Sequence, residues 1–335
     1  MIRKLQGIYF KFLRKLSSSR SLSPEAITWG YRLFLDREPE SPSAVLEKLR
    51  RLSNTQDLRQ EFVNSAEFRE KNVACRILPL TGNEPPMLIE KVSDLRPLFS
   101  HIQNVWENLG ETEPYWSVLS SEQFKSSRIE VTRSEFYNSG SDNVETLFKT
   151  LVRNGIDTTS LRACLEYGCG LGRVTYWLAK RFDRVIGYDI SRSHLQLAQK
   201  YLSEAGIQNV SLHHVNKPQD IRNFPKVDMV YSVIVLQHNP PPIIHVTIQA
   251  LIKALNSGGI AFFQVPTYRL GYRFSLREYL TSDATRGDIE MHVLPQSEIF
   301  EIVRTEQARV IDIFEDNWTG LRYGERSNTF VIQKE

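Results

Sequence analysis

The residues best suited to chemistry stand in and after the short stretch LEYGCGLGR. Three glycines, Gly168, Gly170 and Gly172, alternate with other residues directly after an apolar run. Glycine accepts unusual backbone angles and has no side chain, so a ligand can approach the backbone closely. Glu166 precedes these glycines, and Asp189 follows them at the end of the next apolar run. The pattern predicts a site for a small molecule that carries a positive group and hydroxyl groups.

The spacing excludes two common nucleotide loops. A dinucleotide site would place its third glycine three residues after the second, where Arg173 stands. A P-loop would continue with Gly-Lys-Ser or Gly-Lys-Thr, which does not follow here. Glu166 would repel a pyrophosphate but suits an ammonium group, and Asp189 can accept both hydroxyls of a ribose. A nucleoside that carries an amino acid and no phosphate fits these residues, and S-adenosylmethionine is such a molecule.

Alternating strand and helix patterns surround these residues. Apolar runs predict seven strands: ACLEY, RVIGYD, VSLHHV, VDMVYSVIV, GGIAFFQV, RVIDIFE and NTFVIQ. Helical patterns such as SHLQLAQKYLSEAG lie between the earlier strands, and the last two strands are expected to pair antiparallel. We therefore expect an α/β fold, with a Rossmann-like, mostly parallel sheet of seven strands and helices on both faces. Ligands of such sheets bind beyond the carboxyl ends of the strands, where the glycine stretch falls.

The region from about residue 160 to 270 resembles the class I S-adenosylmethionine-dependent methyltransferases. LEYGCGLGR is similar to the first family motif, VIGYDIS to the second, VDMVYSVIVLQHNPPP to the fourth-strand region and ALNSGGIAFFQV to the fifth strand. The resemblance implies that Glu166 orients the methionine amino group, Asp189 holds the ribose and Ile190 lies against the adenine. The family often has an acid after its third strand, and Asn216 offers an amide there instead. The implied cofactor-binding residues are Glu166, Gly168, Cys169, Gly170, Gly172, Asp189, Ile190 and Asn216.

Two histidines are candidates for a catalytic base. His238 stands in VLQHNPPP after the fourth strand, which is similar to the LEHVPDP segment of quinone-biosynthesis and related small-molecule methyltransferases. His292 stands in IEMHVLPQ, within an insert before the last strands. A cofactor contact or helix cap is the alternative for His238, and structural packing for His292. Gln237, Tyr268 and Tyr272 are expected to contact the acceptor, and the two tyrosines offer rings on which flat faces can stack.

Two further expectations concern residues near the cofactor. The stretches EPYWSVLSSEQF and SEFYNSG are expected to form a lid, with Tyr115, Trp116 and Tyr137 facing the cofactor. Cys169 is expected to be a small packing residue, because no base stands near it in the sequence and buried cysteines are usually inert. The NPPP sequence after His238 stands about six residues too late to match the motif of amino-group methyltransferases, and it lacks their aromatic residue.

The chain is expected to contain four segments. Residues 1–22 are basic and amphipathic, and residues 1–20 could make peripheral contact with an anionic membrane surface or pack on protein. Residues 23–72 predict a small all-α domain. Its stretch YRLFLDREPES…FVNSAEF resembles a bacterial domain of unknown function found beside glycan-modifying enzymes, which implies an interaction module. Residues 73–112 are expected to be a linker, and residues 113–335 the methyltransferase domain.

Composition and charge argue against a nucleic-acid partner, a metal site and a membrane span. The 335 residues carry a net charge of +3, which is mild for a dedicated nucleic-acid binder, so no nucleic-acid partner is expected. Three cysteines without metal-ligand spacing favour a reducing compartment and no metal site. No apolar run reaches the roughly 18 residues of a membrane span. We expect a cytoplasmic protein, with the inner membrane face as the site of any peripheral contact.

Together these features predict an S-adenosylmethionine-dependent methyltransferase. The expected acceptor is a small molecule or a glycan-linked group, methylated at oxygen in cell-surface polysaccharide or related biosynthesis. The alternatives are a scaffold that binds cofactor or glycan without turnover, and a nucleic-acid methyltransferase. The sequence leaves open the identity of the acceptor, the methylated atom, the base and the oligomeric state.

Overall fold

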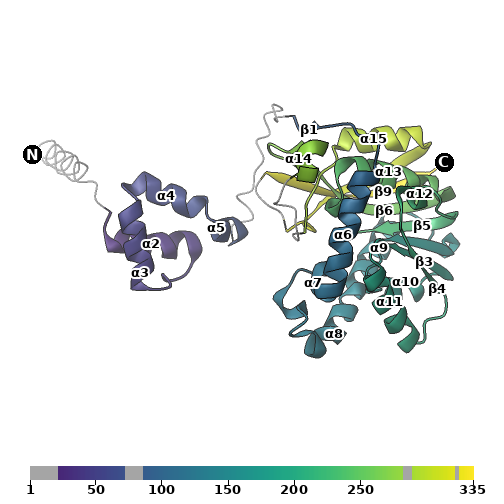
Figure 1. The fold of residues 1–335 in the computed structure, drawn as a ribbon, viewed down its shortest axis with the longest axis horizontal. Helices are drawn as coiled ribbons and strands as arrows, with labels where there is room; N and C mark the ends of the chain where they lie inside the picture. Colours follow the sequence, from purple (N-terminus) through teal and green to yellow (C-terminus); the bar gives the residue numbers. More distant parts are fainter. Residues whose placement is uncertain (1–21, 72–85, 282–288, 321–323) are drawn as a thin grey trace, which may run out of the picture. The chain divides into compact units, whose positions relative to one another are not determined.

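A computed structural model of the chain describes residues 22–71, 86–281, 289–320 and 324–335 (Figure 1). Contacts divide the chain into two compact units, residues 1–80 and residues 81–335, which are described separately. The amphipathic segment expected at residues 1–22 lies outside the described residues, apart from Leu22. None of the described helices is long and apolar enough to cross a membrane.

The described part of the first unit consists of helices, as the sequence predicted. They are α2 (Pro24–Leu35), α3 (Pro42–Arg51), α4 (Thr55–Val63) and α5 (Ala66–Lys71). Ser23 starts α2, because its hydroxyl accepts a hydrogen bond from the Ala26 N–H over 3.2 Å and Pro24 occupies the first turn. Apolar faces of the helices meet in a small core of Ile27, Tyr31, Leu35, Val45, Leu58 and Phe62.

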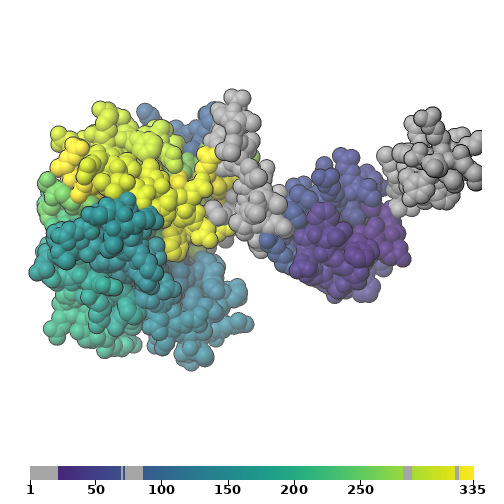
Figure 2. All heavy atoms as spheres, turned by 180° about the vertical axis from the view of Figure 1, so that it is seen from behind, coloured from purple at the N-terminus to yellow at the C-terminus, as the bar shows by residue number. Residues whose placement is uncertain are grey.

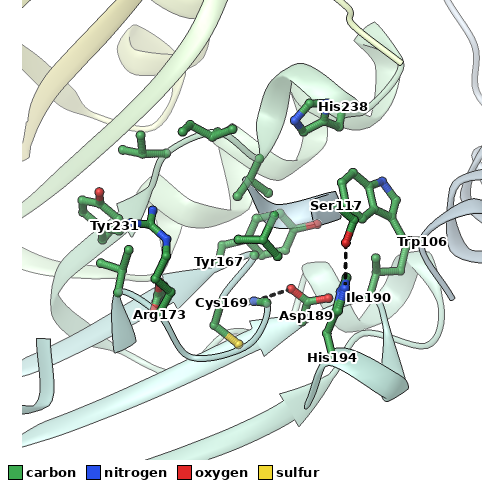
Figure 3. A pocket seen from close by; sticks show the side chains of 18 of the residues that line it. Trp106, Ser117, Tyr167, Cys169, Arg173, Asp189, Ile190, His194, Tyr231 and His238 are labelled. Atoms are coloured by element: carbon green, nitrogen blue, oxygen red, sulfur yellow. Dashed lines mark hydrogen bonds between the residues drawn. The ribbon is translucent and has the colours of Figure 1, made fainter. Parts of the chain in front are cut away.

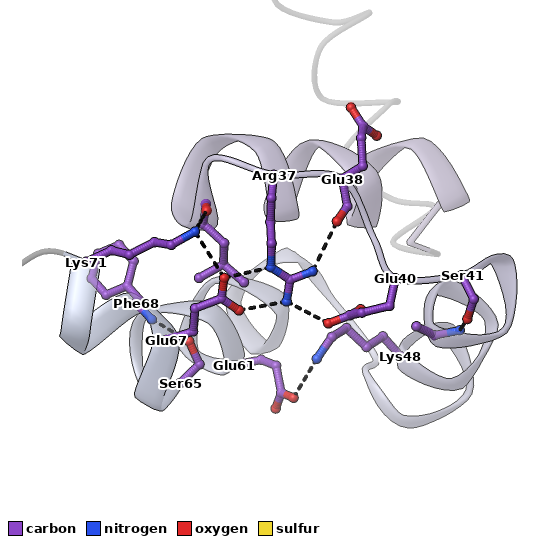
Figure 4. Close-up of polar contacts among 12 residues, drawn as sticks. Arg37, Glu38, Glu40, Ser41, Lys48, Glu61, Ser65, Glu67, Phe68 and Lys71 are labelled. Carbon is purple, nitrogen blue, oxygen red and sulfur yellow. Dashed lines mark hydrogen bonds and ion pairs between the residues drawn. The ribbon is translucent and has the colours of Figure 1, made fainter. Parts of the chain in front are cut away.

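An arginine ties the loop after α2 to the last helix of this unit (Figure 4). Arg37 Nε and Nη2 each lie 2.6 Å from a carboxylate oxygen of Glu67 on α5. Arg37 Nη2 also lies 2.6 Å from Glu40 Oε1. These hydrogen bonds hold the pKa of Glu67 at about 2, well below its ordinary value. Arg37 and Glu67 both belong to the stretch that resembles the domain of unknown function, and here they hold the helices together.

A seven-stranded sheet forms the centre of the second unit, in the order β4-β3-β2-β5-β6-β9-β8 (Figure 1). Its strands are β2 (Ala163–Tyr167), β3 (Arg184–Asp189), β4 (Val210–His214), β5 (Val227–Ser232), β6 (Leu255–Arg269), β8 (Ala308–Asp316) and β9 (Glu325–Lys334). The pairs from β4 to β6 are parallel, whereas β9 runs antiparallel to both β6 and β8. The expected Rossmann-like sheet is therefore confirmed.

Helices cover both faces of the sheet, because successive strand residues point to opposite sides. Leu165 packs in one hydrophobic cluster with α6 (Arg96–Thr112), α13 (Pro241–Lys253) and α15 (Gln296–Thr305). Cys164 packs in the other cluster with α9 (Gly140–Arg153) and α10 (Thr175–Ala179). Further elements are α7 (Pro114–Val118), η2 (Glu122–Phe124), α8 (Ile129–Asn138), η3 (Thr158–Ser160), α11 (Arg192–Glu204), α12 (Pro218–Ile221), η4 (Leu236–His238) and α14 (Leu276–Thr281).

Two segments that are far apart in the sequence, the end of α9 and strand β8, lie side by side in the second unit. Asn154, at the end of α9, donates a hydrogen bond from Nδ2 to Asp312 Oδ2 on β8 over 2.9 Å. Figure 2 shows the corresponding dark teal and yellow surfaces side by side. Helix α9, which precedes β2 in the chain, is therefore hydrogen-bonded at its end to the edge strand β8.

The expected linker at residues 73–112 needs correction. Helix α6 occupies its second half, and Leu98, Phe99 and Ile102 of α6 are buried against the sheet. A short parallel pair, β1 (Leu88–Ile89) with β7 (Arg273–Phe274), also joins this segment to the later insert. The apolar stripe of α6 makes residues 88–112 part of the second unit.

Candidate active site

A pocket lies beyond the carboxyl ends of β2, β3 and β5, where open α/β sheets bind their ligands (Figure 3). The glycine loop after β2, the turns after β3 and β5, and the helices α6, α7 and η4 supply its walls. Its polar and aromatic lining includes Trp106, Ser117, Glu166, Tyr167, Arg173, Asp189, His194, Tyr231, His238 and Asn239.

The glycine loop is folded by hydrogen bonds from β3. The N–H groups of Gly168 and Cys169 both donate to the carbonyl of Tyr188, over 2.7 and 3.0 Å. Gly168 has a φ of 77° and Gly170 a φ of 50°, in the left-handed region that favours glycine. A Cβ on Gly168 would lie 2.3 Å from the side chain of Val235, which also lines the pocket. Bare backbone therefore borders the pocket at this loop.

Asp189 is buried at the end of β3, and its carboxylate orders two neighbouring loops. Oδ2 accepts the N–H of Gly170 over 2.7 Å, and Oδ1 accepts the N–H of Ser191 over 2.8 Å. Each carboxylate oxygen can accept a second hydrogen bond. Because Asp189 also lines the pocket, both oxygens can receive hydroxyl groups of a ligand.

Glu166 is a buried carboxyl group that lines the same pocket. Its Oε2 accepts a hydrogen bond from the Thr175 hydroxyl over 2.6 Å. Burial raises the pKa of Glu166 to about 8, against the opposing effects of Thr175 and of the nearby Arg173 guanidinium. The carboxyl is therefore largely protonated at neutral pH in the free protein. An ammonium group placed beside it would favour the charged form.

Arg173 brings a buried cation to the pocket, in the position where a dinucleotide loop has its third glycine. Its Nη1 donates to Asn143 Oδ1 over 2.8 Å and to Ser139 Oγ over 3.2 Å. Its Nε has no hydrogen-bond partner among the described residues. Sequence reasoning noted Arg173 only as a missing glycine, because its burial beneath α9 leaves no local signal. A guanidinium with a free donor can bind a carboxylate.

His238 lines the pocket from η4, and Figure 3 shows its ring at the opposite side from the glycine loop. Its Nδ1 lies 2.8 Å from the backbone carbonyl of Glu290, which fixes the proton on Nδ1. Burial lowers the pKa of His238 to about 4, so the ring is neutral at physiological pH. A neutral imidazole with a lone pair on Nε2 can accept a proton.

The stretch expected to form a lid contributes helix α7 to the pocket wall, but not through the expected aromatic residues. Ser117 and Val118 of α7 line it, and Ser117 Oγ lies 3.0 Å from His194 Nε2 on α11. Tyr115 and Tyr137 instead pack in a separate apolar cluster with Leu171 and other residues. The sequence of the five-residue helix α7 does not show which of its side chains face the pocket, so it pointed to Tyr115 rather than to Ser117 and Val118.

Two residues of the expected cofactor set, Gly172 and Asn216, lie outside the pocket lining. Gly172 does not line the pocket, and a Cβ there would meet Ala198 at 3.4 Å, so this glycine serves the packing of the loop on α11. Asn216 is exposed and does not line the pocket. Its Oδ1 lies 3.4 Å from Nε2 of Gln103. Cys169 lines the pocket, and burial raises the pKa of its thiol, which fits a packing residue.

Two expected acceptor residues lie elsewhere. Tyr268 belongs to β6, which runs further than expected, and its ring lies beneath the Arg326 guanidinium rather than in the pocket. Gln237 is only 2% exposed and does not line the pocket. Its side chain instead contacts Gln264 and His238. Neither placement supports a direct acceptor contact.

His292 and Tyr272 line a second pocket, formed with the insert after β6. Tyr272 Oη lies 2.7 Å from His292 Nδ1, and His292 Nε2 lies 3.0 Å from the carboxylate of Glu290. Glu290 also receives Tyr279 Oη at 2.5 Å and His101 Nε2 at 3.0 Å. The structure therefore brings His238 to the cofactor pocket but not His292, whose expected catalytic role is not supported by its position.

No group of three or more histidine, cysteine, aspartate or glutamate side chains within the described ranges is arranged to hold a metal ion. The pocket offers four groups to a ligand. The Asp189 carboxylate can accept hydroxyl groups, the Glu166 carboxyl suits an ammonium group, the Arg173 guanidinium suits a carboxylate, and His238 is a neutral imidazole.

Comparisons with known proteins give relatives of one enzyme class. Residues 164–259 match the family model described as a methyltransferase domain. The ubiquinone biosynthesis O-methyltransferase of Escherichia coli O6:H1 is 26% identical over 174 residues, which cover 50% of this chain and 69% of the relative. The enzyme of the same name from Azoarcus is 25% identical over 182 residues, covering 51% and 72%. The structure of magnesium protoporphyrin IX methyltransferase from Synechocystis aligns with a TM-score of 0.50 at 16% identity, covering 71% of this chain and 99% of that one, which shows the fold alone.

The sheet order, the pocket at its carboxyl edge and the matched domain define the fold of a class I methyltransferase. The chain is an S-adenosylmethionine-dependent methyltransferase, with residues 164–259 at the centre of its cofactor domain.

Proposed function

We propose that this enzyme transfers a methyl group from S-adenosylmethionine to a hydroxyl of a small-molecule or glycan-linked acceptor. The observation that carries the proposal is the meeting of Glu166, Arg173, Asp189 and His238 around one pocket. The O-methyltransferase relatives support oxygen as the methylated atom. The resemblance of the first unit to a domain found beside glycan-modifying enzymes supports a role in cell-surface polysaccharide or related biosynthesis.

The residues present fit the cofactor at three points. Glu166 and Arg173 offer partners of opposite charge for the amino and carboxylate groups of the methionine part. The unpartnered Arg173 Nε is explained if it donates to that carboxylate. Asp189 keeps two acceptor positions for the ribose hydroxyls, and Ile190, which follows it, offers an apolar contact for the adenine. A Cβ on Gly168 would lie 2.3 Å from the side chain of Val235, which lines the same pocket, so the loop has no room for a side chain there.

The bound cofactor supplies a methyl group that is already activated by the positive charge of its sulfur. The protein then has to align the acceptor and exclude water. The acceptor oxygen forms a bond to the methyl carbon while the carbon–sulfur bond breaks, and the electron pair of that bond stays on sulfur. We propose that His238 Nε2 accepts the hydroxyl proton in this step. The Nδ1–H bond to the Glu290 carbonyl holds the ring in place for it.

Two further assignments extend the proposal. The first unit is proposed to be an interaction module. Residues 1–20 are proposed to contact an anionic membrane surface, since they carry six basic and no acidic residues. Co-sedimentation of the full chain with vesicles containing anionic lipid, and its loss in salt, would test this contact.

Transfer of a labelled methyl group tests the function directly. Purified enzyme, labelled S-adenosylmethionine and fractionated cell extract are expected to give label in a small-molecule or glycan fraction. Label in nucleic acid would contradict the proposed acceptor class. Cofactor binding without transfer to any fraction would indicate a scaffold without turnover.

A further inference from the structure

Four hydrogen bonds form a continuous chain through the floor of the active site. The N–H of Ile234 donates to Gln264 Oε1 over 3.0 Å, and Gln264 Nε2 donates to Gln237 Oε1 over 2.9 Å. Gln237 Nε2 lies 3.2 Å from His238 Nε2, and His238 Nδ1 lies 2.8 Å from the Glu290 carbonyl. Gln264 is fully buried and Gln237 is 2% exposed, so water does not replace these partners.

The two ends of the chain fix its direction. The oxygen and nitrogen of a glutamine amide are usually assigned from their neighbours. Here a backbone N–H begins the chain and can only donate, so Gln264 Oε1 faces Ile234. Gln264 Nε2 must then face an acceptor, which is Gln237 Oε1, and the Gln237 N–H faces His238. The backbone carbonyl of Glu290 ends the chain and can only accept, so it independently requires a proton on His238 Nδ1.

We infer that Gln264 and Gln237 are positioning residues that hold His238 as the neutral Nδ1–H tautomer, with its lone pair on Nε2. The inference rests on the proposed role of His238 as the base. Protonation of Nε2 would set two N–H groups against each other at Gln237 and break the chain. The base therefore stays ready to accept a proton until an acceptor hydroxyl displaces the Gln237 N–H, whose 3.2 Å bond is long.

The position of Gln264 explains a strained turn beside the cofactor site. Ile234 has a φ of 61°, in the left-handed region, which is rare for a β-branched residue. Its N–H is held by Gln264, and its side chain lines the cofactor pocket. Gln264 Nε2 also donates to Ser327 Oγ on β9 over 2.8 Å, which anchors the amide from the other side. Strain of this kind concentrates at functional sites, and here one side chain secures both the turn and the histidine.

Other groups around His238 agree with a neutral ring. The charged and titratable groups that face it are the Glu290 carboxyl, which favours a positive charge, and His292, which opposes one. Burial is the largest effect and lowers the pKa of His238. Trp106, with its ring centre 5.4 Å from that of His238, supplies an apolar wall.

Nitrogen NMR of the full chain with labelled histidine tests the inference, with a His238→Asn variant to identify the signal. We expect a proton on Nδ1, a bare Nε2, and no titration between about pH 6 and 8. In Gln237→Glu, a carboxylate oxygen faces Nε2 while the Glu290 carbonyl still requires the Nδ1 proton. His238 should then be doubly protonated at about pH 6. Gln199→Glu, on the exposed face of α11, should leave the signal unchanged.

Several results would overturn the inference. A wild-type ring with its proton on Nε2, or one that titrates near neutral pH, would contradict it. So would an unchanged His238 signal in Gln237→Glu. If that variant does not fold, Gln264→Glu can replace it. A carboxylate oxygen at position 264 would face the Gln237 amide, which would then turn its N–H toward that carboxylate and its oxygen toward His238 Nε2. His238 should again become doubly protonated. The measurement needs no acceptor, so failure of methyl transfer would count against the proposed function alone.

Discussion

The backbone N–H of Gly170 donates a hydrogen bond to Oδ2 of Asp189 over 2.7 Å. This bond joins the glycine loop after β2 to the acid that ends β3. The same carboxylate accepts the Ser191 N–H at the start of α11. Asp189 therefore orders the glycine loop and lines the pocket, where we propose that its oxygens accept the ribose hydroxyls of the cofactor.

Replacing Asp189 with alanine should weaken cofactor binding strongly. The change removes both proposed ribose contacts and the acceptor that orders Gly170, so we expect at least a tenfold higher Kd, or about 1.4 kcal/mol. Calorimetry with S-adenosylmethionine measures the change. Asp183 is exposed and directly precedes β3, so Asp183→Ala should leave the Kd unchanged. Unaltered binding in Asp189→Ala would contradict the cofactor assignment.

Cofactor binding should release a proton from Glu166. The pKa of this carboxyl is raised to about 8 by burial, so the free protein holds its proton at pH 7. The ammonium group of the cofactor favours the ionised form, so affinity should rise with pH up to about 8 and then level off. Calorimetry in buffers of different ionisation enthalpy measures the proton count.

Glu166→Gln is the matched control for this proton release. The variant should bind more weakly and release no proton. The raised pKa also means that ionisation of the unfolded chain destabilises the free protein increasingly from about pH 4.5 to 8. Glu166→Gln should therefore be the more stable protein at pH 7, by roughly 1–3 kcal/mol. Equal proton release in both proteins would assign it to another group.

Gly168→Ala should weaken cofactor binding as well as strain the backbone. Its φ of 77° disfavours alanine, and the added Cβ would lie 2.3 Å from the Val235 side chain. Gly206→Ala is a matched control, since its φ is 71° and no atom lies within 4 Å of the added Cβ. Both variants should lose about 1 kcal/mol of stability from the left-handed conformation. Only Gly168→Ala should raise the Kd for the cofactor, and equal Kd values would refute the close approach at this loop.

Arg37→Lys should loosen the first unit without affecting the site. Lysine cannot replace the two parallel contacts from Arg37 to Glu67. Hydrogen exchange in the full chain should become faster in helices α4 and α5, while the cofactor Kd stays the same. Because the pKa of Glu67 is lowered to about 2, its stabilising effect should persist above its ordinary pKa and disappear as the pH falls toward 2. Arg59→Lys, at an exposed position of α4, serves as the control.

The central part of the fold and site was accessible from sequence because its signals are local. Strand and helix alternation predicted the sheet, and the spacing from Glu166 through the glycines to Asp189 indicated a nucleoside with an amino acid. These residues lie within one strand–loop–helix–strand segment, and β2 and β3 are paired neighbours, so a short stretch of chain brings them together.

The remaining features depend on long-range contacts that no local pattern reports. The buried face of α6 became visible only against the sheet, which is why residues 88–112 were mistaken for a linker. Arg173 is held in the pocket wall by a hydrogen bond to Asn143, which lies on another helix. His292 was expected in the site because of its residue type, but Glu290 and Tyr272 hold it in a second pocket. Gln264, in the middle of a strand, gave no signal.

A crystal structure with S-adenosylhomocysteine bound would show whether the cofactor occupies the pocket beyond β2, β3 and β5. We expect the ribose hydroxyls within hydrogen-bond distance of Asp189, the amino group beside Glu166, the carboxylate beside Arg173 and the sulfur on the side of His238. A ligand found instead in the second pocket, between Tyr272 and His292, would contradict this expectation.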